Sequence, residues 1–243
     1  MKKVFLILIA LLSFIGCQPT NQPYTAENGM VVSAHPLASA VGTEIMKQGG
    51  NAIDAAVATG FALAVCYPSA GNIGGGGFMV IRLKNGETAT LDYREKAPAA
   101  ATETMYLDSL GEPIDGMSLY THHAAGVPGS VDGMITAWEK YGSLPFGKLI
   151  APAIEIAENG FGLTEMQAAA YNELRETFLE RNNYPTAFTE KETWQAGDNF
   201  VQTDLANTLK AINENGRAGF YAGKVAELTV SEMKKSGGLI TLE

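Results

Sequence analysis

The sequence predicts an α/β fold in which strands and buried helices come first and a mostly helical half follows. Three observations support this prediction. AIDAAVATGFALAVC is apolar nearly all round, as a buried helix is. Two β-prone runs in GFMVIRLKNGETATLDYRE flank a turn. Helical patterns with glycine or polar stops fill the chain from about residue 129. With 243 residues, 46% of them hydrophobic, the chain can bury a substantial core.

The first elements begin and end at recognisable residues. GMVVSA (29–34) is expected to form a short strand. Pro36 suits the first turn of a helix that continues through LASAVGTEIMKQ and stops at Gly49. Asn51 is expected to cap the apolar helix that follows, whose Ala and Gly positions favour close packing against a sheet.

The hairpin is the clearest local signal in the chain. Its two β-prone runs flank Lys84-Asn85-Gly86, and Asn-Gly is the preferred pair for a tight type I′ turn. The helices expected after it are SVDGMITAWEKYG, GKLIAPAIEIAENG, a longer one over 164–182, TDLANTLKAINENG and FYAGKVAELTVSEMKKSGG.

The N-terminus has the features of a targeting segment. Two lysines precede an apolar run that ends in Phe14-Ile15-Gly16-Cys17, which resembles a bacterial lipobox. We therefore predict a signal peptide over 1–16, lipidation of Cys17, a polar tether over 17–28 and a domain over 29–243. The protein would then be exported and lipid-anchored in the bacterial cell envelope. An ordinary secretory signal is the alternative.

Charge and cysteine content exclude several classes of protein. The formal net charge of −9 argues against a nucleic-acid partner. No stretch in the body of the chain is long and apolar enough to cross a bilayer. If Cys17 carries a lipid, Cys66 has no internal disulfide partner, and its place at the end of FALAVC predicts a buried residue, not a nucleophile.

The glycine run in GNIGGGGFMV (71–80) does not bind phosphate by either familiar pattern. A P-loop requires a Lys-Ser/Thr pair that is missing after Gly77, and the spacing also fails the GxGxxG dinucleotide pattern. The run precedes a strand, so no helix N-terminus is offered to an anion.

No metal or cofactor is predicted. The histidines are His35, His122 and His123, and the last two are adjacent, so they cannot share one helix face as i,i+4 ligands do. No cysteine cluster is present. Structural or surface roles are expected for these histidines. A Ser-His-Asp triad stays open, although the sequence contains no GxSxG elbow.

Arg94 is the candidate binding residue. It lies in Asp92-Tyr93-Arg94-Glu95, where the second hairpin strand ends, and its planar five-donor fork suits a carboxylate. The pattern alone favours a surface Arg paired with Glu95 or Asp92, with carboxylate binding as the alternative.

Several ordered blocks resemble the gamma-glutamyltransferase family (gamma-glutamyltranspeptidase, glutathione hydrolase). They are GMVVSAHPLASAVGTEIMKQGGNAIDAAVATGFALAVCYPSAGNIGGGGFMV, LDYREKAPAAAT, HHAAGVPGSVDGMITAWEKYGSLPFGKLIAPAIEIAENGF, GDNFVQTDLANTLKAINENG, FYAGKVAE and GGLIT. Together they cover essentially everything after the signal.

The resemblance implies an N-terminal-nucleophile hydrolase with an αββα sandwich that cleaves itself into two subunits. The threonine freed by cleavage would attack γ-glutamyl amides such as glutathione, and water or an acceptor amino acid would resolve the acyl-enzyme. By similarity, Arg94 would bind the glutamyl α-carboxylate, and no cofactor is implied. The glycine run would then be a close-packing and turn segment that leads the hairpin to Arg94.

The sequence also departs from the family pattern. It stops at GGLITLE, within what resembles the large-subunit region, and it contains no Thr-Thr-His-Tyr/Phe-Ser-type motif. Thr121-His122-His123 resembles that motif only in part, because Ala124 and Ala125 follow it. We therefore expect an incomplete large-subunit domain, with no catalytic residue in this chain and the small subunit as its partner. The alternatives are a truncated noncatalytic lipoprotein, a γ-glutamyl-binding remnant and a cephalosporin-acylase-like relative that acts on other acyl amides.

Overall fold

The computed structural model describes residues 23–242.

The most buried helix, α3 (Ala52–Cys66), begins at a complete capping box. The Asn51 side chain accepts hydrogen bonds from the N–H groups of Ile53 and Asp54 at 2.8 and 3.0 Å, and the Asp54 carboxylate accepts from the Asn51 N–H at 2.9 Å. The predicted cap and the predicted burial of this helix are both confirmed.

The helix before it, α2 (Pro36–Lys47), also follows the prediction, with Pro36 as its first residue. His35 caps it, because its Nδ1 accepts a hydrogen bond from the Leu37 N–H at 3.3 Å. The two helices pack against each other.

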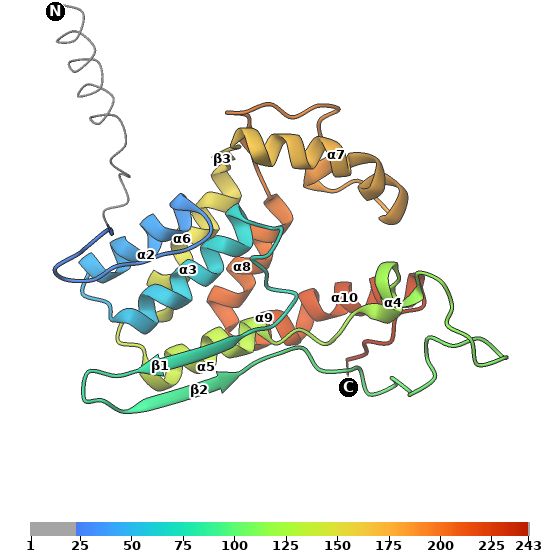
Figure 1. Ribbon diagram of the computed structural model, residues 1–243, viewed down its shortest axis with the longest axis horizontal. Helices are drawn as coiled ribbons and strands as arrows, with labels where there is room; N and C mark the ends of the chain where they lie inside the picture. Colours follow the sequence, from blue (N-terminus) through green and yellow to red (C-terminus); the bar gives the residue numbers. More distant parts are fainter. Residues whose placement is uncertain (1–22, 243) are drawn as a thin grey trace, which may run out of the picture. The chain divides into compact units, whose positions relative to one another are not determined.

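The core forms where α3 meets its neighbours. Helix α3 contacts α2, α5 (Ser130–Tyr141) and α6 (Phe146–Asn159), and α6 in turn packs on α8 (Thr203–Asn215). Figure 1 shows α2, α3, α6 and α8 above the hairpin and α5 alongside it. The largest fully buried side chains of this core include Phe61, Leu149, Ile150, Leu209 and Ile212. Their removal from water supplies the main driving force for folding.

The predicted hairpin is confirmed, but its turn differs from the prediction. Strands β1 (Phe78–Arg82) and β2 (Thr88–Asp92) pair antiparallel. Gly86 has φ +90°, and no non-glycine residue in the described part of the chain has positive φ. A type I′ turn needs positive φ at both central residues, so Asn85 excludes it. The N–H of Gly86 donates to the Leu83 carbonyl at 2.9 Å, which is typical of a three-residue loop with glycine in the left-handed position.

One face of the hairpin is packed and the other is open. Ile81 is 3% exposed and belongs to the core, whereas Val80, the next residue on the opposite face, is 82% exposed. Strand β2 contacts α5, and the hairpin runs along that helix (Figure 1). Helix α5 is therefore the support on which the end of β2 rests.

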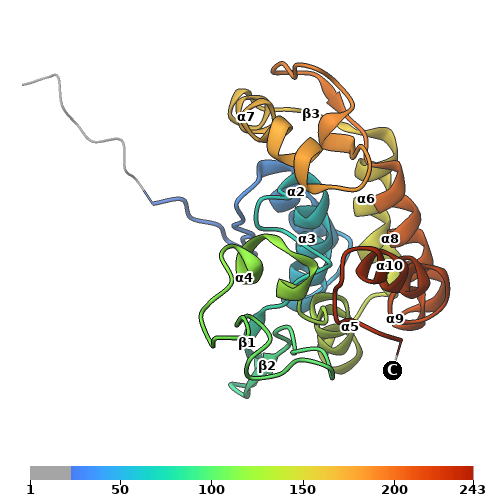
Figure 2. The ribbon, with the colours of Figure 1, turned by 90° about the vertical axis from the view of Figure 1, so that its right-hand side faces the viewer.

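The remaining elements surround this centre (Figure 2). They are α4 (Met117–Tyr120), η1 (His122–Ala124), β3 (Phe161–Gly162), α7 (Glu165–Arg181), η2 (Ala187–Thr189), β4 (Asn199–Phe200), α9 (Ala218–Tyr221) and α10 (Gly223–Lys235). Strand β3 pairs antiparallel with β4. The helix predicted from Phe220 onward is instead two helices, because Ala222 is extended and Gly223 has φ +59°.

The strand predicted over residues 29–34 is wrong. These residues form no regular element, and Val32 is 83% exposed. A strand exists only when a neighbouring strand completes its hydrogen bonds, and residues 23–242 provide none for this segment. Among the helices in that range, none combines the length and apolar character needed to cross a bilayer.

Candidate substrate-binding site

The glycine run lies between the end of the hairpin and the start of α5. Gly77 and Tyr93 exchange backbone hydrogen bonds at 3.3 and 3.0 Å, which extends the hairpin pairing one step beyond β1 and β2. The carbonyl of Gly75 accepts from the N–H groups of Gly129 and Ser130 at 2.7 and 3.0 Å. This carbonyl caps α5, whose own N-cap residue, Gly129, has no side chain to do so.

Asn72 fixes the bend of the run. Its Oδ1 accepts hydrogen bonds from the Gly75 N–H at 2.8 Å and from the Ser130 hydroxyl at 2.7 Å. One side chain therefore ties the glycine run to itself and to α5.

Several glycines in this region lie so close to Tyr93 and Arg94 that a larger residue would not fit. A Cβ on Gly76 would stand 2.7 Å from the Arg94 Cα, one on Gly129 would stand 2.9 Å from the Arg94 carbonyl oxygen, and one on Gly133 would stand 2.5 Å from the Tyr93 Cβ. Real Cβ atoms do not come this close to their neighbours. The predicted close-packing role of GNIGGGG is confirmed for Gly71, Gly76 and Gly77, whereas a Cβ on Gly74 would meet nothing within 4 Å. Two glycines near the start of α5 share the role.

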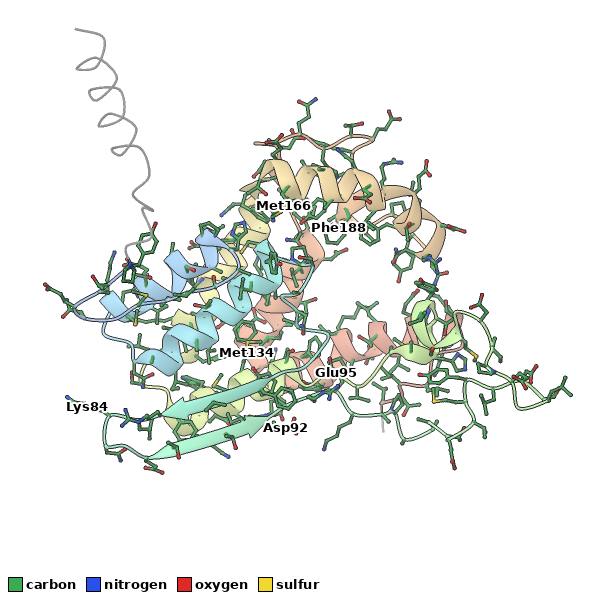
Figure 3. The ribbon with its side chains drawn as sticks, in the orientation of Figure 1. Lys84, Asp92, Glu95, Met134, Met166 and Phe188 are labelled. Atoms are coloured by element: carbon green, nitrogen blue, oxygen red, sulfur yellow. The ribbon has the colours of Figure 1, made fainter. Side chains whose placement is uncertain are left out.

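Arg94 is the second residue after β2, and it is exposed. Its N–H donates to Asp92 Oδ1 at 3.1 Å, and its guanidinium carbon lies 5.9 Å from the centre of the Phe78 ring. Figure 3 shows Asp92 and Glu95 where the hairpin ends and Lys84 at its opposite end. Within residues 23–242 Arg94 forms no ion pair, so the surface pairing with Asp92 or Glu95 that the pattern favoured is not formed.

Two cavities adjoin Arg94. The first, of about 430 Å³, is lined by Arg94, Glu95, Lys96, Tyr106 and His123 among others. The second, of about 340 Å³, shares Arg94 and Lys96 but is also lined by Asp92 and Asp132. Arg94 therefore lies where the two hollows meet.

The wall of the first cavity joins segments that are distant in sequence. Lys96 and Val127 exchange backbone hydrogen bonds at 3.2 and 2.8 Å. The Tyr106 hydroxyl donates to the carbonyl of His123 at 3.2 Å. These bonds hold residues 94–98, 101–106 and 123–126 around one space.

An ion-pair group stands at the edge of the second cavity. Arg217 contacts Asp132, donates to Glu139 at 2.7 Å and donates to the Thr136 hydroxyl at 2.8 Å. Its hydrogen bond to Glu139 lowers the pKa of that carboxyl. The Tyr221 hydroxyl donates to the Pro128 carbonyl at 2.9 Å. The charge of Asp132 is thus already partnered by Arg217.

The histidines take three different places. His35 caps α2, as described above, and its ring meets Phe161 edge-on at 5.9 Å. His122 Nε2 lies 3.7 Å from Glu232 Oε1, and Glu232 also accepts from the Tyr184 hydroxyl at 2.6 Å. The expected structural roles fit His35 and His122, whereas His123 lines the Arg94 cavity. The described part of the chain holds no group of three His, Cys, Asp or Glu side chains placed to share a metal ion.

Cys66 is fully buried and free, as predicted, and burial raises the pKa of its thiol to about 11. A thiol with such a pKa is almost entirely protonated at neutral pH, so it is not an activated nucleophile.

Sequence reasoning found Arg94 but missed Lys96, Tyr106 and His123 as its neighbours. Lys96 had one available signal, since residues i and i+2 of an extended chain face the same side. Tyr106 and His123 had none, because the chain must fold before they reach Arg94.

Comparison with known proteins agrees with this fold. A family model described as Gamma-glutamyltranspeptidase matches residues 38–243. The chain is 51% identical over 224 residues to a glutathione hydrolase proenzyme of Pseudomonas sp. (strain A14), and 47% identical over 223 residues to one of Escherichia coli (strain K12). Each alignment covers 91% of this chain but 39% and 38% of those proteins, so the chain spans about two fifths of their length.

Solved structures give the same result. The gamma-glutamyltranspeptidase of Helicobacter pylori matches 91% of this chain and 64% of its own with a TM-score of 0.85 at 49% identity. That of Pseudomonas nitroreducens, complexed with L-DON, matches 90% of this chain and 64% of its own with a TM-score of 0.82 at 44% identity. A cephalosporin acylase of Bacillus halodurans matches 93% of this chain and 44% of its own with a TM-score of 0.74 at 27% identity.

These likenesses define first the class of protein, an α/β N-terminal-nucleophile hydrolase, as the sequence predicted. Within that class, the chain belongs to the gamma-glutamyltranspeptidase family.

Proposed function

We propose that this chain forms the substrate-anchoring part of a gamma-glutamyltransferase or glutathione hydrolase, and that Arg94 binds the α-carboxylate of the γ-glutamyl group. The position of Arg94 carries the proposal. Its guanidinium is exposed, has no ion pair within residues 23–242 and follows a hairpin held by close glycine contacts. A guanidinium can donate two parallel hydrogen bonds to one carboxylate, which fixes both position and orientation.

The proposed reaction is acyl transfer. A threonine hydroxyl attacks the γ-carbonyl carbon, the C–N bond of the amide breaks, and the leaving amine takes up a proton. Water then attacks the glutamyl ester and releases glutamate, or the amine of an acceptor amino acid attacks it and forms a new γ-glutamyl amide. The threonine motif does not occur in this sequence, so we assign the nucleophile to the small subunit and carboxylate binding to this chain.

The proposal includes the location of the protein. Residues 1–22, which contain the predicted signal peptide and Cys17, lie outside the described residues. Residues 23–28 are exposed and form no helix or strand. We propose a lipid anchor at Cys17 on a tether over 17–28, with the enzyme domain from residue 29 acting on γ-glutamyl compounds outside the cytoplasm.

A second candidate is a noncatalytic lipoprotein that binds γ-glutamyl compounds. The observation in its favour is that these 243 residues include Arg94 but not the threonine motif. Both candidates assign the same task to Arg94, and they differ only in whether bound substrate is turned over.

A chimera tests the enzymatic proposal. Residues 23–243 would be joined to the segment of the 51% identical Pseudomonas proenzyme that follows the matched region. We expect the chimera to cleave itself into two subunits and to hydrolyse a chromogenic γ-glutamyl anilide. The chain alone should show no turnover, because the activated threonine is missing. A cleaved but inactive chimera, or turnover by the isolated chain that a substitution within it abolishes, would contradict the proposal.

A further inference from the structure

The cavity beside Arg94 contains a second cationic side chain. Lys96 lines the same space of about 430 Å³, is exposed and forms no ion pair among residues 23–242. His123 and the Tyr106 ring line the same space. Glu95 is the one acidic side chain among its lining residues.

The backbone around Lys96 is fixed. The two hydrogen bonds with Val127 hold it in an antiparallel bridge, while Tyr93, three residues earlier, is paired with Gly77. Residues two apart on an extended chain face the same side and lie roughly 7 Å apart. Arg94 and Lys96 therefore present two positive charges in one direction, and their long side chains have room to adjust the distance between them.

Lys96 lines both cavities at Arg94. The smaller one is also lined by Asp92 and Asp132, and Arg217 already partners the charge of Asp132. The larger one has Arg94, Lys96 and the single acid Glu95. A ligand held at Arg94 by one carboxylate and carrying a second carboxylate therefore meets Lys96 in either cavity, and the larger cavity gives it more room.

We propose that Lys96 forms a second carboxylate-binding position, which selects amine partners that carry a carboxylate of their own. The inference rests on the proposed binding of the γ-glutamyl α-carboxylate by Arg94. In glutathione the group beyond the scissile amide ends in a glycine carboxylate. The departing amine and an incoming acceptor amine occupy the same side of the acyl-enzyme, since transfer is the reverse of acylation. Lys96 would thus serve both the donor's leaving group and an amino-acid or peptide acceptor.

Titration calorimetry on residues 23–243 tests the inference with two ligands. Glutathione has both carboxylates, whereas a γ-glutamyl anilide has only the one assigned to Arg94. Lys96→Gln removes the charge at similar length and leaves the backbone bridge to Val127 intact. Lys84→Gln makes the same change at the far end of the hairpin, at an exposed lysine that lines neither cavity, and is the matched control.

We expect Lys96→Gln to weaken glutathione binding by roughly three- to tenfold, as loss of one charge-assisted contact at a partly exposed site does. Anilide binding should stay within about twofold of the unsubstituted chain, and Lys96→Arg should restore glutathione binding. If Lys96→Gln weakens the binding of both ligands equally, or of neither, the proposed role of Lys96 is wrong, and the proposed role of Arg94 still stands. If the unsubstituted chain binds neither ligand, the proposed function fails together with the inference.

Discussion

Gly133 lies directly against Tyr93, so that a Cβ on the glycine would stand 2.5 Å from the Cβ of the tyrosine. Tyr93 is the residue before Arg94 and is paired with Gly77 through its backbone. The Tyr93 side chain therefore packs directly on helix α5 where Gly133 has no side chain, and the position of Arg94 depends on that contact.

Gly133→Ala should destabilise the protein even though alanine favours helices by about 1 kcal/mol over glycine. The new methyl group would overlap Tyr93, and overpacking of this kind costs about 1–3 kcal/mol. We expect a lower Tm by thermal unfolding and weaker γ-glutamyl binding. Gly147→Ala in α6 is the matched control, because its Cβ would meet only the end of the Asn213 side chain at 3.1 Å. A Gly133→Ala variant as stable as this control would show that the close contact is unimportant.

Asp54 should make the fold sensitive to acid. It is fully buried and accepts hydrogen bonds from the Ser143 hydroxyl at 2.5 Å and from the backbone N–H groups of Ser143, Leu144 and Asn51. Burial raises the pKa of this carboxyl, but these hydrogen bonds outweigh burial, and the pKa lies below its ordinary value. The stabilisation is therefore fully present above the unfolded pKa of about 4 and is lost as the pH falls through the lower folded pKa.

Asp54→Asn tests this dependence. At pH 7 it should lower the free energy of unfolding by about 2–4 kcal/mol, because a buried charged acceptor of several hydrogen bonds is lost. The difference from the unsubstituted chain should shrink as the pH falls below the ordinary carboxyl range. Urea unfolding at several pH values measures it, with the exposed Asp115→Asn as control. A difference that stays constant down to pH 2 would contradict this account of Asp54.

Cys17 should be the lipid-modified first residue of the mature protein when the whole chain is expressed in a bacterial host. The prediction rests on the lysine-apolar-Gly-Cys order at the N-terminus. Mass spectrometry of the membrane fraction should find an acylated Cys17, and Cys17→Ser should abolish the modification. An unmodified mature start after residue 17 would contradict it.

The sequence was sufficient where short-range signals decide the structure. The Asn51 cap and Pro36 act within a few residues, so α2 and α3 could be predicted with their starts. The turn type depended on Asn85, whose φ is set by the whole loop and not by the Asn-Gly pair alone. The pairing of β3 with β4 was not predicted, because two-residue strands carry no periodicity and their register joins Phe161 to Phe200.

The site, too, has parts that the sequence predicted and parts that only the folded structure reveals. Arg94 was found because its own motif resembles that of a known family, and the glycine run was understood as close packing for the same reason. Further close contacts at Tyr93 and Arg94 come from Gly129 and Gly133, whose only sequence signal was glycine near the start of a helix. Lys96 meets His123 across one cavity only after the chain pairs Lys96 with Val127.

Replacing Arg94 with lysine in the chimera tests the central claim most directly. Lysine keeps the charge but cannot form the planar two-bond fork, so kcat/KM for a γ-glutamyl anilide should fall by the equivalent of about 2–4 kcal/mol. Self-cleavage should be unaffected, since it involves no substrate carboxylate. Arg82→Lys, at the other end of β1, should change neither. Near wild-type kcat/KM in a fully cleaved Arg94→Lys chimera would contradict the assignment of Arg94 as the carboxylate anchor.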